Sequence, residues 1–129
     1  FLSRDITVRD LITHKGDVHH VFPKNYLKKY GLSRSRYNQI ANYVIMQSEI
    51  NIAIGDESPI EYFNELLNQC ENGRNHYGAI NDLDLLKENF KMHCIPDGME
   101  NKNIDHFESF LIERRKLMAL KIRDYYLQL

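Results

Sequence analysis

The second half of the chain carries apolar residues at helical spacing. Ser58-Pro-Ile-Glu61 is a capping box with proline at the first helical position, and the apolar residues after it predict a helix to about Asn72. Asn81 or Asp82 caps a second helical run, which the Pro-Asp-Gly sequence at 96–98 breaks.

A third and longer helix is expected from about Ile104 to Leu127. Its apolar residues recur at helical intervals and should form one buried stripe: Phe107, Phe110, Leu111, Leu117, Leu120 and Tyr125. We expect four aromatic residues at helical spacing to lie in the core: Tyr62, Phe63, Phe107 and Phe110.

The first half predicts two short strands, each followed by a short helix. Residues Asp17–Phe22 and Ala41–Met46 are rich in Val, Ile, Phe and Tyr and are bounded by turn-forming or polar residues. Pro23 can occupy the first position of a helix over Lys24–Tyr30 that stops at Gly31. Ser48 caps another helix to about Ile54, and Gly55 ends it. The predicted class is α+β and mostly helical, with helices packed on a two-stranded hairpin.

Length and composition favour one soluble globular domain spanning residues 1–129. The chain is 43% hydrophobic and 27% charged, and no segment is apolar for long enough to span a membrane. Because it opens on Phe1, we expect a fragment of a longer protein. Cys70 and Cys94 are the only cysteines and do not form a close pair, which favours a reducing, cytoplasmic setting.

Charge is unevenly distributed along the chain. The net charge is only -1, but no acidic residue lies between Asp17 and Glu49, whereas five basic residues do: Lys24, Lys28, Lys29, Arg34 and Arg36. Acidic residues outnumber basic ones from Glu49 to Glu108. Such asymmetry can focus a positive field on one surface, although solvated helix faces would give the same pattern.

The segment Asp17-Val-His-His-Val-Phe-Pro-Lys24 is the most informative for chemistry. Adjacent residues of a strand point to opposite faces, so His19 and His20 must have different roles unless the strand ends or bulges there. One imidazole can bind a metal while the other takes a proton from water near neutral pH. Two ordinary surface or half-buried histidines would explain the pair equally simply.

The order His19-His20, Asn42 and Asn51 across strand, strand and helix resembles the HNH motif, the ββα-metal finger. A longer match resembles the C-terminal HNH region (DUF 1524 type) that follows a ParB-like DUF 262 domain in GmrSD-class restriction enzymes. Its segments are His19-His-Val-Phe-Pro-Lys24, Ala41-Asn-Tyr-Val-Ile45, Asn51-Ile-Ala-Ile-Gly55, Pro59-Ile-Glu-Tyr62, His93-Cys-Ile-Pro96 and Phe110-Leu-Ile-Glu-Arg-Arg115.

The resemblance implies a metal-dependent DNA endonuclease with a role for each motif residue. His20 matches the general base that activates water, and Asn42 matches a residue that braces the loop after the first strand. His19 and Asn51 match metal ligands. The metal-finger core would span about 16–56 and a helical part about 58–129. An N-terminal DUF 262 domain, absent from this chain, would be its partner alongside DNA.

The metal expected from this pattern is Mg²⁺ or Mn²⁺. A common HNH pattern places a further His four residues after the last ligand, but here that residue is Gly55. With only His19 and Asn51 as clear ligands, tight Zn²⁺ binding is less favoured. Asp17 or Asp56 would also be able to reach the ion, although loop carboxylates are usually only solvated.

Other side chains have competing interpretations. Lys24, Lys28 and Lys29 follow the histidine pair and are candidates for phosphate contacts, or serve solubility alone. One of Arg114 and Arg115 is expected to pack its stem or pair with an acid.

A rival metal site and a rival function remain open. The first is a structural zinc site built from Cys70, His76, His93 and Cys94, although adjacent ligands are a poor spacing for zinc. The second is a domain of the same fold without catalytic activity that binds nucleic acid or another protein.

Overall fold

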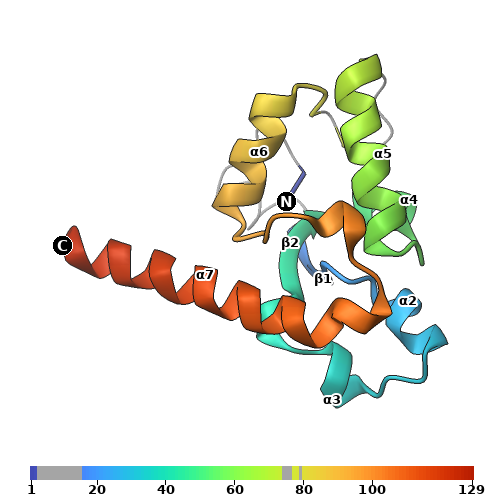
Figure 1. Ribbon diagram of the computed structural model, residues 1–129, viewed down its shortest axis with the longest axis horizontal. Helices are drawn as coiled ribbons and strands as arrows, with labels where there is room; N and C mark the ends of the chain where they lie inside the picture. Colours follow the sequence, from blue (N-terminus) through green and yellow to red (C-terminus); the bar gives the residue numbers. More distant parts are fainter. Residues whose placement is uncertain (3–15, 74–76, 79) are drawn as a thin grey trace.

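The computed structural model describes residues 1–2, 16–73, 77–78 and 80–129, and Figure 1 shows their arrangement. In chain order the described elements are β1 (Gly16–His20), α2 (Lys24–Lys29), α3 (Arg34–Tyr37), the 3-10 helix η1 (Ile40–Asn42), β2 (Tyr43–Gln47), α4 (Ser48–Ile54), α5 (Pro59–Asn72), α6 (Leu83–Met92), the 3-10 helices η2 (Met99–Asn101) and η3 (Ile104–His106), and α7 (Phe107–Leu127). The expected class, mostly helical α+β with a two-stranded antiparallel sheet, is confirmed.

The two strands lie close to their predicted positions but are shifted. β1 and β2 pair antiparallel, with His19 opposite Val44 and His20 opposite Tyr43. β1 begins one residue earlier than expected and stops at His20, because the next two residues leave the ladder and enter the core. The second strand begins after Asn42, which ends η1 instead of leading the strand.

The capping signals in the sequence correctly predict where two helices begin. At α5 the Ser58 hydroxyl accepts from the Glu61 backbone N–H at 3.2 Å, and the Glu61 carboxylate accepts from the Ser58 N–H at 2.9 Å. At α6 the Asp82 carboxylate accepts from the backbone N–H groups of Asp84 and Leu85. These bonds satisfy donors that a helix N-terminus otherwise leaves open.

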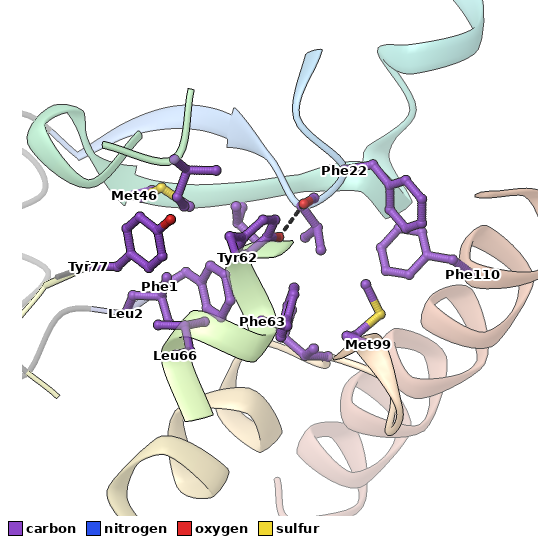
Figure 2. Packing of buried hydrophobic residues seen from close by; sticks show 14 of the residues in the cluster. Phe1, Leu2, Phe22, Met46, Tyr62, Phe63, Leu66, Tyr77, Met99 and Phe110 are labelled. Atoms are coloured by element: carbon purple, nitrogen blue, oxygen red, sulfur yellow. Dashed lines mark hydrogen bonds between the residues drawn. The ribbon is translucent and has the colours of Figure 1, made fainter. Parts of the chain in front are cut away.

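The core is a cluster of aromatic and aliphatic side chains beneath the two-stranded sheet, shown from close by in Figure 2. The four aromatic residues predicted to be buried are at most 2% exposed: Tyr62, Phe63, Phe107 and Phe110. Phe22 packs against Phe110 with ring centroids 4.8 Å apart, which joins the chain after β1 to α7. The Tyr62 hydroxyl donates to the Val21 carbonyl, so α5 also holds this segment.

The expected stripe along the last helix is buried only in its first part. Phe107, Phe110 and Leu111 are buried, whereas Leu120 and Tyr125 are 45% and 63% exposed. The prediction is wrong for the second part because α7 runs out past the body of the domain (Figure 1). Within the part of the chain described here, no helix has both the length and the apolar composition needed to cross a membrane.

Candidate active site

The histidine pair lies at the end of β1. The strand pairing puts His19 on the same face as Val44, which is buried, and His20 on the opposite face with the half-buried Tyr43. Both histidines are half-buried. Because β1 ends at His20, the two rings lie where the chain turns toward α2, and each ring has a different environment.

The His20 ring is held by one hydrogen bond and two aromatic neighbours. Its Nε2 atom lies 2.8 Å from the Asn38 side-chain oxygen. The rings of Tyr43 and Tyr37 meet it edge-on, with centroids 5.4 and 6.0 Å away. Together these contacts define both the plane of the imidazole and the direction of its Nε2 atom.

The surroundings of His20 favour its neutral form. Burial lowers the pKa of this imidazole, and the positive charges of Lys24 and His19 lower it further, while the hydrogen bond to Asn38 acts in the opposite direction. The net pKa is below the ordinary value of 6.5. A neutral imidazole has a lone pair available at pH 7, so this ring is able to accept a proton there.

Asn42 is fully buried and hydrogen-bonded to the loop after β1. Its side-chain oxygen accepts from the Phe22 backbone N–H at 2.8 Å. Its amide nitrogen donates to the carbonyls of Phe22 and Tyr37, each at 3.2 Å. Its own carbonyl accepts from the Val21 N–H at 2.8 Å. These bonds hold the backbone of the segment that begins one residue after His20.

Asn51 lies on α4, which contacts β1 as well as β2. Ile50 and Ile54 on the same helix are buried in the core, and Asn51 is half-buried at the edge of that face. His19 faces the same core from β1, since its partner in the ladder is the buried Val44. An imidazole nitrogen and a carboxamide oxygen are both suitable ligand atoms for a divalent cation.

The three lysines proposed for phosphate contacts have different environments. Lys24 lies close enough to lower the pKa of His20, and its ammonium is 5.9 Å from the centroid of the Tyr37 ring. Lys28 is exposed. Lys29 forms an exposed ion pair with Asp56 at 2.6 Å. Asp56, considered as a possible metal ligand, is therefore paired with a lysine.

Arg114 holds this region through bonds that the sequence did not predict. One of Arg114 and Arg115 is expected to pack its stem or pair with an acid; Arg114 is 4% exposed, and its guanidinium donates to three backbone carbonyls instead of an acid. The acceptors are Ala41 at 3.0 Å, Tyr43 at 2.6 Å and His93 at 3.0 Å. The available signal was its position four residues after Phe110, on the buried face of α7.

The remaining sequence candidates do not assemble a metal centre among the residues that can be placed. The Asp17 side chain and His76 lie outside the described residues. Cys94 is buried, and the His93 ring packs edge-on against Phe1 with centroids 5.6 Å apart. In the described ranges no group of three or more His, Cys, Asp or Glu side chains is placed to hold a metal ion.

Comparison with known proteins gives one distant relative. An uncharacterized protein of Methanocaldococcus jannaschii is 30% identical to this chain, over 86% of the chain and 21% of that protein. The chain therefore spans about a fifth of the length of that relative. No protein-family model and no solved structure matches the chain.

Proposed function

We propose that this chain is a metal-dependent endonuclease domain of the HNH type that hydrolyses DNA phosphodiester bonds. The observation that supports this most directly is the end of β1. There a half-buried imidazole whose pKa favours the neutral form is followed by a loop bonded to a buried asparagine. Orientation of a base by fixed neighbours is what general base catalysis requires.

In the proposed reaction His20 accepts a proton from a water molecule. The oxygen of that water attacks phosphorus, and the bond from phosphorus to the leaving oxygen breaks. Asn42 holds the loop that follows the base through its bonds to Phe22. Lys24, close to His20, contacts a phosphate beside the cleaved bond. A leaving oxygen that takes up a solvent proton completes the hydrolysis.

A divalent ion, Mg²⁺ or Mn²⁺, is proposed to bind between His19 and Asn51. The donor atoms fit such an ion, and the two residues lie on contacting elements, β1 and α4. The ion would supply charge stabilisation on the phosphate and the leaving oxygen. In this proposal the chain is the cleavage module of a restriction or defence protein, and its N-terminal partner is a DUF 262 domain.

The test is nicking of supercoiled plasmid DNA with Mg²⁺ or Mn²⁺, with and without EDTA. His20→Ala should abolish nicking by removing the base. His106→Gln is a matched control, because the bond described for that half-buried imidazole is a capping bond accepted from the Asn103 N–H. Circular dichroism at the assay temperature should show both variants folded. Full activity of the His20→Ala protein would overturn the assignment of the base.

A second function is favoured by the exposed cations in the acid-free segment between Asp17 and Glu49. Lys24, Lys28 and Arg34 are all exposed. A domain of the same fold without cleavage activity would retain DNA through such cations, and binding would weaken steeply with salt. Salt-sensitive retention of the plasmid without metal-dependent nicking would favour this function. Absence of both would favour a protein-interaction domain.

A further inference from the structure

The side chain of Asn38 is hydrogen-bonded to the candidate base. Its oxygen lies 2.8 Å from Nε2 of His20, eighteen residues earlier in the chain. A carboxamide oxygen only accepts hydrogen bonds, so the Nε2 atom must be the donor and must carry the proton. In a neutral imidazole the lone pair then belongs to Nδ1.

We propose that Asn38 is a positioning residue for His20. Its carboxamide oxygen holds the imidazole as the Nε2–H tautomer and directs the unprotonated Nδ1 toward the water that attacks phosphorus. The role of Nδ1 rests on the proposed nuclease function, whereas the tautomer and the orientation of the ring do not. The same logic applies wherever the second nitrogen of a base is held by a fixed acceptor.

Backbone contacts fix the position of Asn38 even though its side chain is exposed. Asn38 is the residue that caps the C-terminus of α3, and its backbone N–H donates to the Arg34 carbonyl at 2.9 Å. The preceding residue, Tyr37, is 3% exposed and accepts a hydrogen bond from Asn42. The side chain that binds His20 is therefore attached to a turn that the core itself holds.

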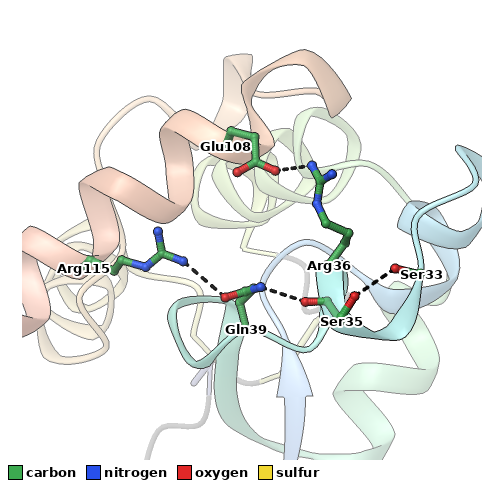
Figure 3. A network of polar contacts seen from close by, with 6 residues as sticks. All are labelled: Ser33, Ser35, Arg36, Gln39, Glu108 and Arg115. Carbon is green, nitrogen blue, oxygen red and sulfur yellow. Dashed lines mark hydrogen bonds and ion pairs between the residues drawn. The ribbon is translucent and has the colours of Figure 1, made fainter.

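A polar network ties both sides of Asn38 to α7, as Figure 3 shows. Before it, the Arg36 guanidinium pairs with the Glu108 carboxylate. After it, the Gln39 side chain donates to the Ser35 carbonyl at 2.7 Å and accepts from Arg115 at 3.2 Å. These contacts restrict movement of α3 away from α7, and so keep the Asn38 oxygen within reach of His20.

The remaining neighbours of His20 orient the ring but do not select a tautomer. Tyr37 and Tyr43 meet the imidazole through ring edges, and Lys24 and His19 act on it through charge. The hydrogen bond to Asn38 is made at one ring nitrogen, Nε2, and so distinguishes it from Nδ1.

The test is the ¹⁵N NMR spectrum of the metal-free chain at a pH well above 7, where two-bond couplings identify the tautomer of each neutral histidine. Wild-type His20 should be in the Nε2–H form. In Asn38→Ala a measurable Nδ1–H fraction should appear, whereas Asn38→Asp, which keeps the acceptor, should restore the wild-type pattern. Ser35→Ala is the control, because that exposed hydroxyl is hydrogen-bonded to Ser33. A wild-type His20 in the Nδ1–H form overturns the proposal without any variant.

Plasmid nicking gives the second measurement. Losing one exposed orienting bond should lower kcat in Asn38→Ala by about three- to tenfold with KM for DNA unchanged, and Asn38→Asp should recover most of it. Unchanged tautomer and unchanged kcat in Asn38→Ala overturn the positioning role. If wild-type protein does not nick DNA but the Nε2–H signature depends on Asn38, the nuclease proposal fails and the contact that orients the ring is supported.

Discussion

Replacement of Asn42 by alanine is expected to cost more stability than its small change in volume suggests. The side chain is fully buried and makes three bonds, to the Phe22 N–H, the Phe22 carbonyl and the Tyr37 carbonyl. Each net hydrogen bond contributes about 1 kcal/mol, and a buried N–H left without an acceptor costs about 1–3 kcal/mol. Two bonds to carbonyls and one orphaned N–H together predict that the free energy of unfolding falls by about 3–5 kcal/mol.

Urea unfolding measures this loss of stability. It is followed by circular dichroism, because the chain has no tryptophan. Asn64→Ala is the matched control, because Asn64 donates to the Ile60 and Glu100 carbonyls from an exposed position and should lose less than about 1 kcal/mol. Equal losses in the two variants would refute the reasoning that the buried bonds of Asn42 hold the loop. The nicking rate of Asn42→Ala, measured at a low temperature at which the variant stays folded, should also fall, because the segment after His20 loses its bonds to Asn42.

Two further predictions concern stability. Arg114→Met should lower the free energy of unfolding by about 2–3 kcal/mol in urea, because three backbone carbonyls lose their donor, whereas Arg115→Met, which loses only an exposed bond to Gln39, should change it by less than about 0.5 kcal/mol. Burial lowers the pKa of His93 to about 4, so between pH 6.5 and 4 the unfolded chain binds more protons than the folded chain. The free energy of unfolding should therefore fall by about 1–2 kcal/mol as the pH drops from 6.5 to 4. A His93→Gln variant that loses as much stability over that range would contradict this assignment.

The sequence was sufficient to predict the elements whose signals are local. The Ser58–Glu61 capping box and the Asp82 cap depend on residues two or three apart, and both helices begin where those patterns place them. The two-stranded sheet was also predictable, although its strands are displaced by one or two residues from the predicted bounds. Where β1 stops was not predictable, because the burial of Val21 and Phe22 against α5 and α7 decides it.

Features that depend on distant partners could not be predicted. Helix α3 has four residues, two of them arginines, and no apolar period, and its contact with Glu108 spans 72 residues. The bonds of Arg114 to Ala41 and Tyr43 span more than 70 residues. In the second part of α7 the sequence predicted burial that the structure does not have. The helical period of Leu120 and Tyr125 predicts a helix but does not indicate whether another surface covers it.

Several of the buried polar contacts hold the segments next to the histidine pair. The Tyr62 hydroxyl binds the Val21 carbonyl, Asn42 binds both backbone groups of Phe22, and Arg114 binds the carbonyls on either side of Asn42. Burying polar groups carries a desolvation cost that an apolar core would avoid, so their benefit lies in fixing one backbone geometry. Burial of Val21 and Phe22 decides where β1 ends, and these hydrogen bonds hold the backbone of the segment that follows. The restraint therefore falls on the segment that determines the direction of His20, which is where a base that must meet a water molecule needs it.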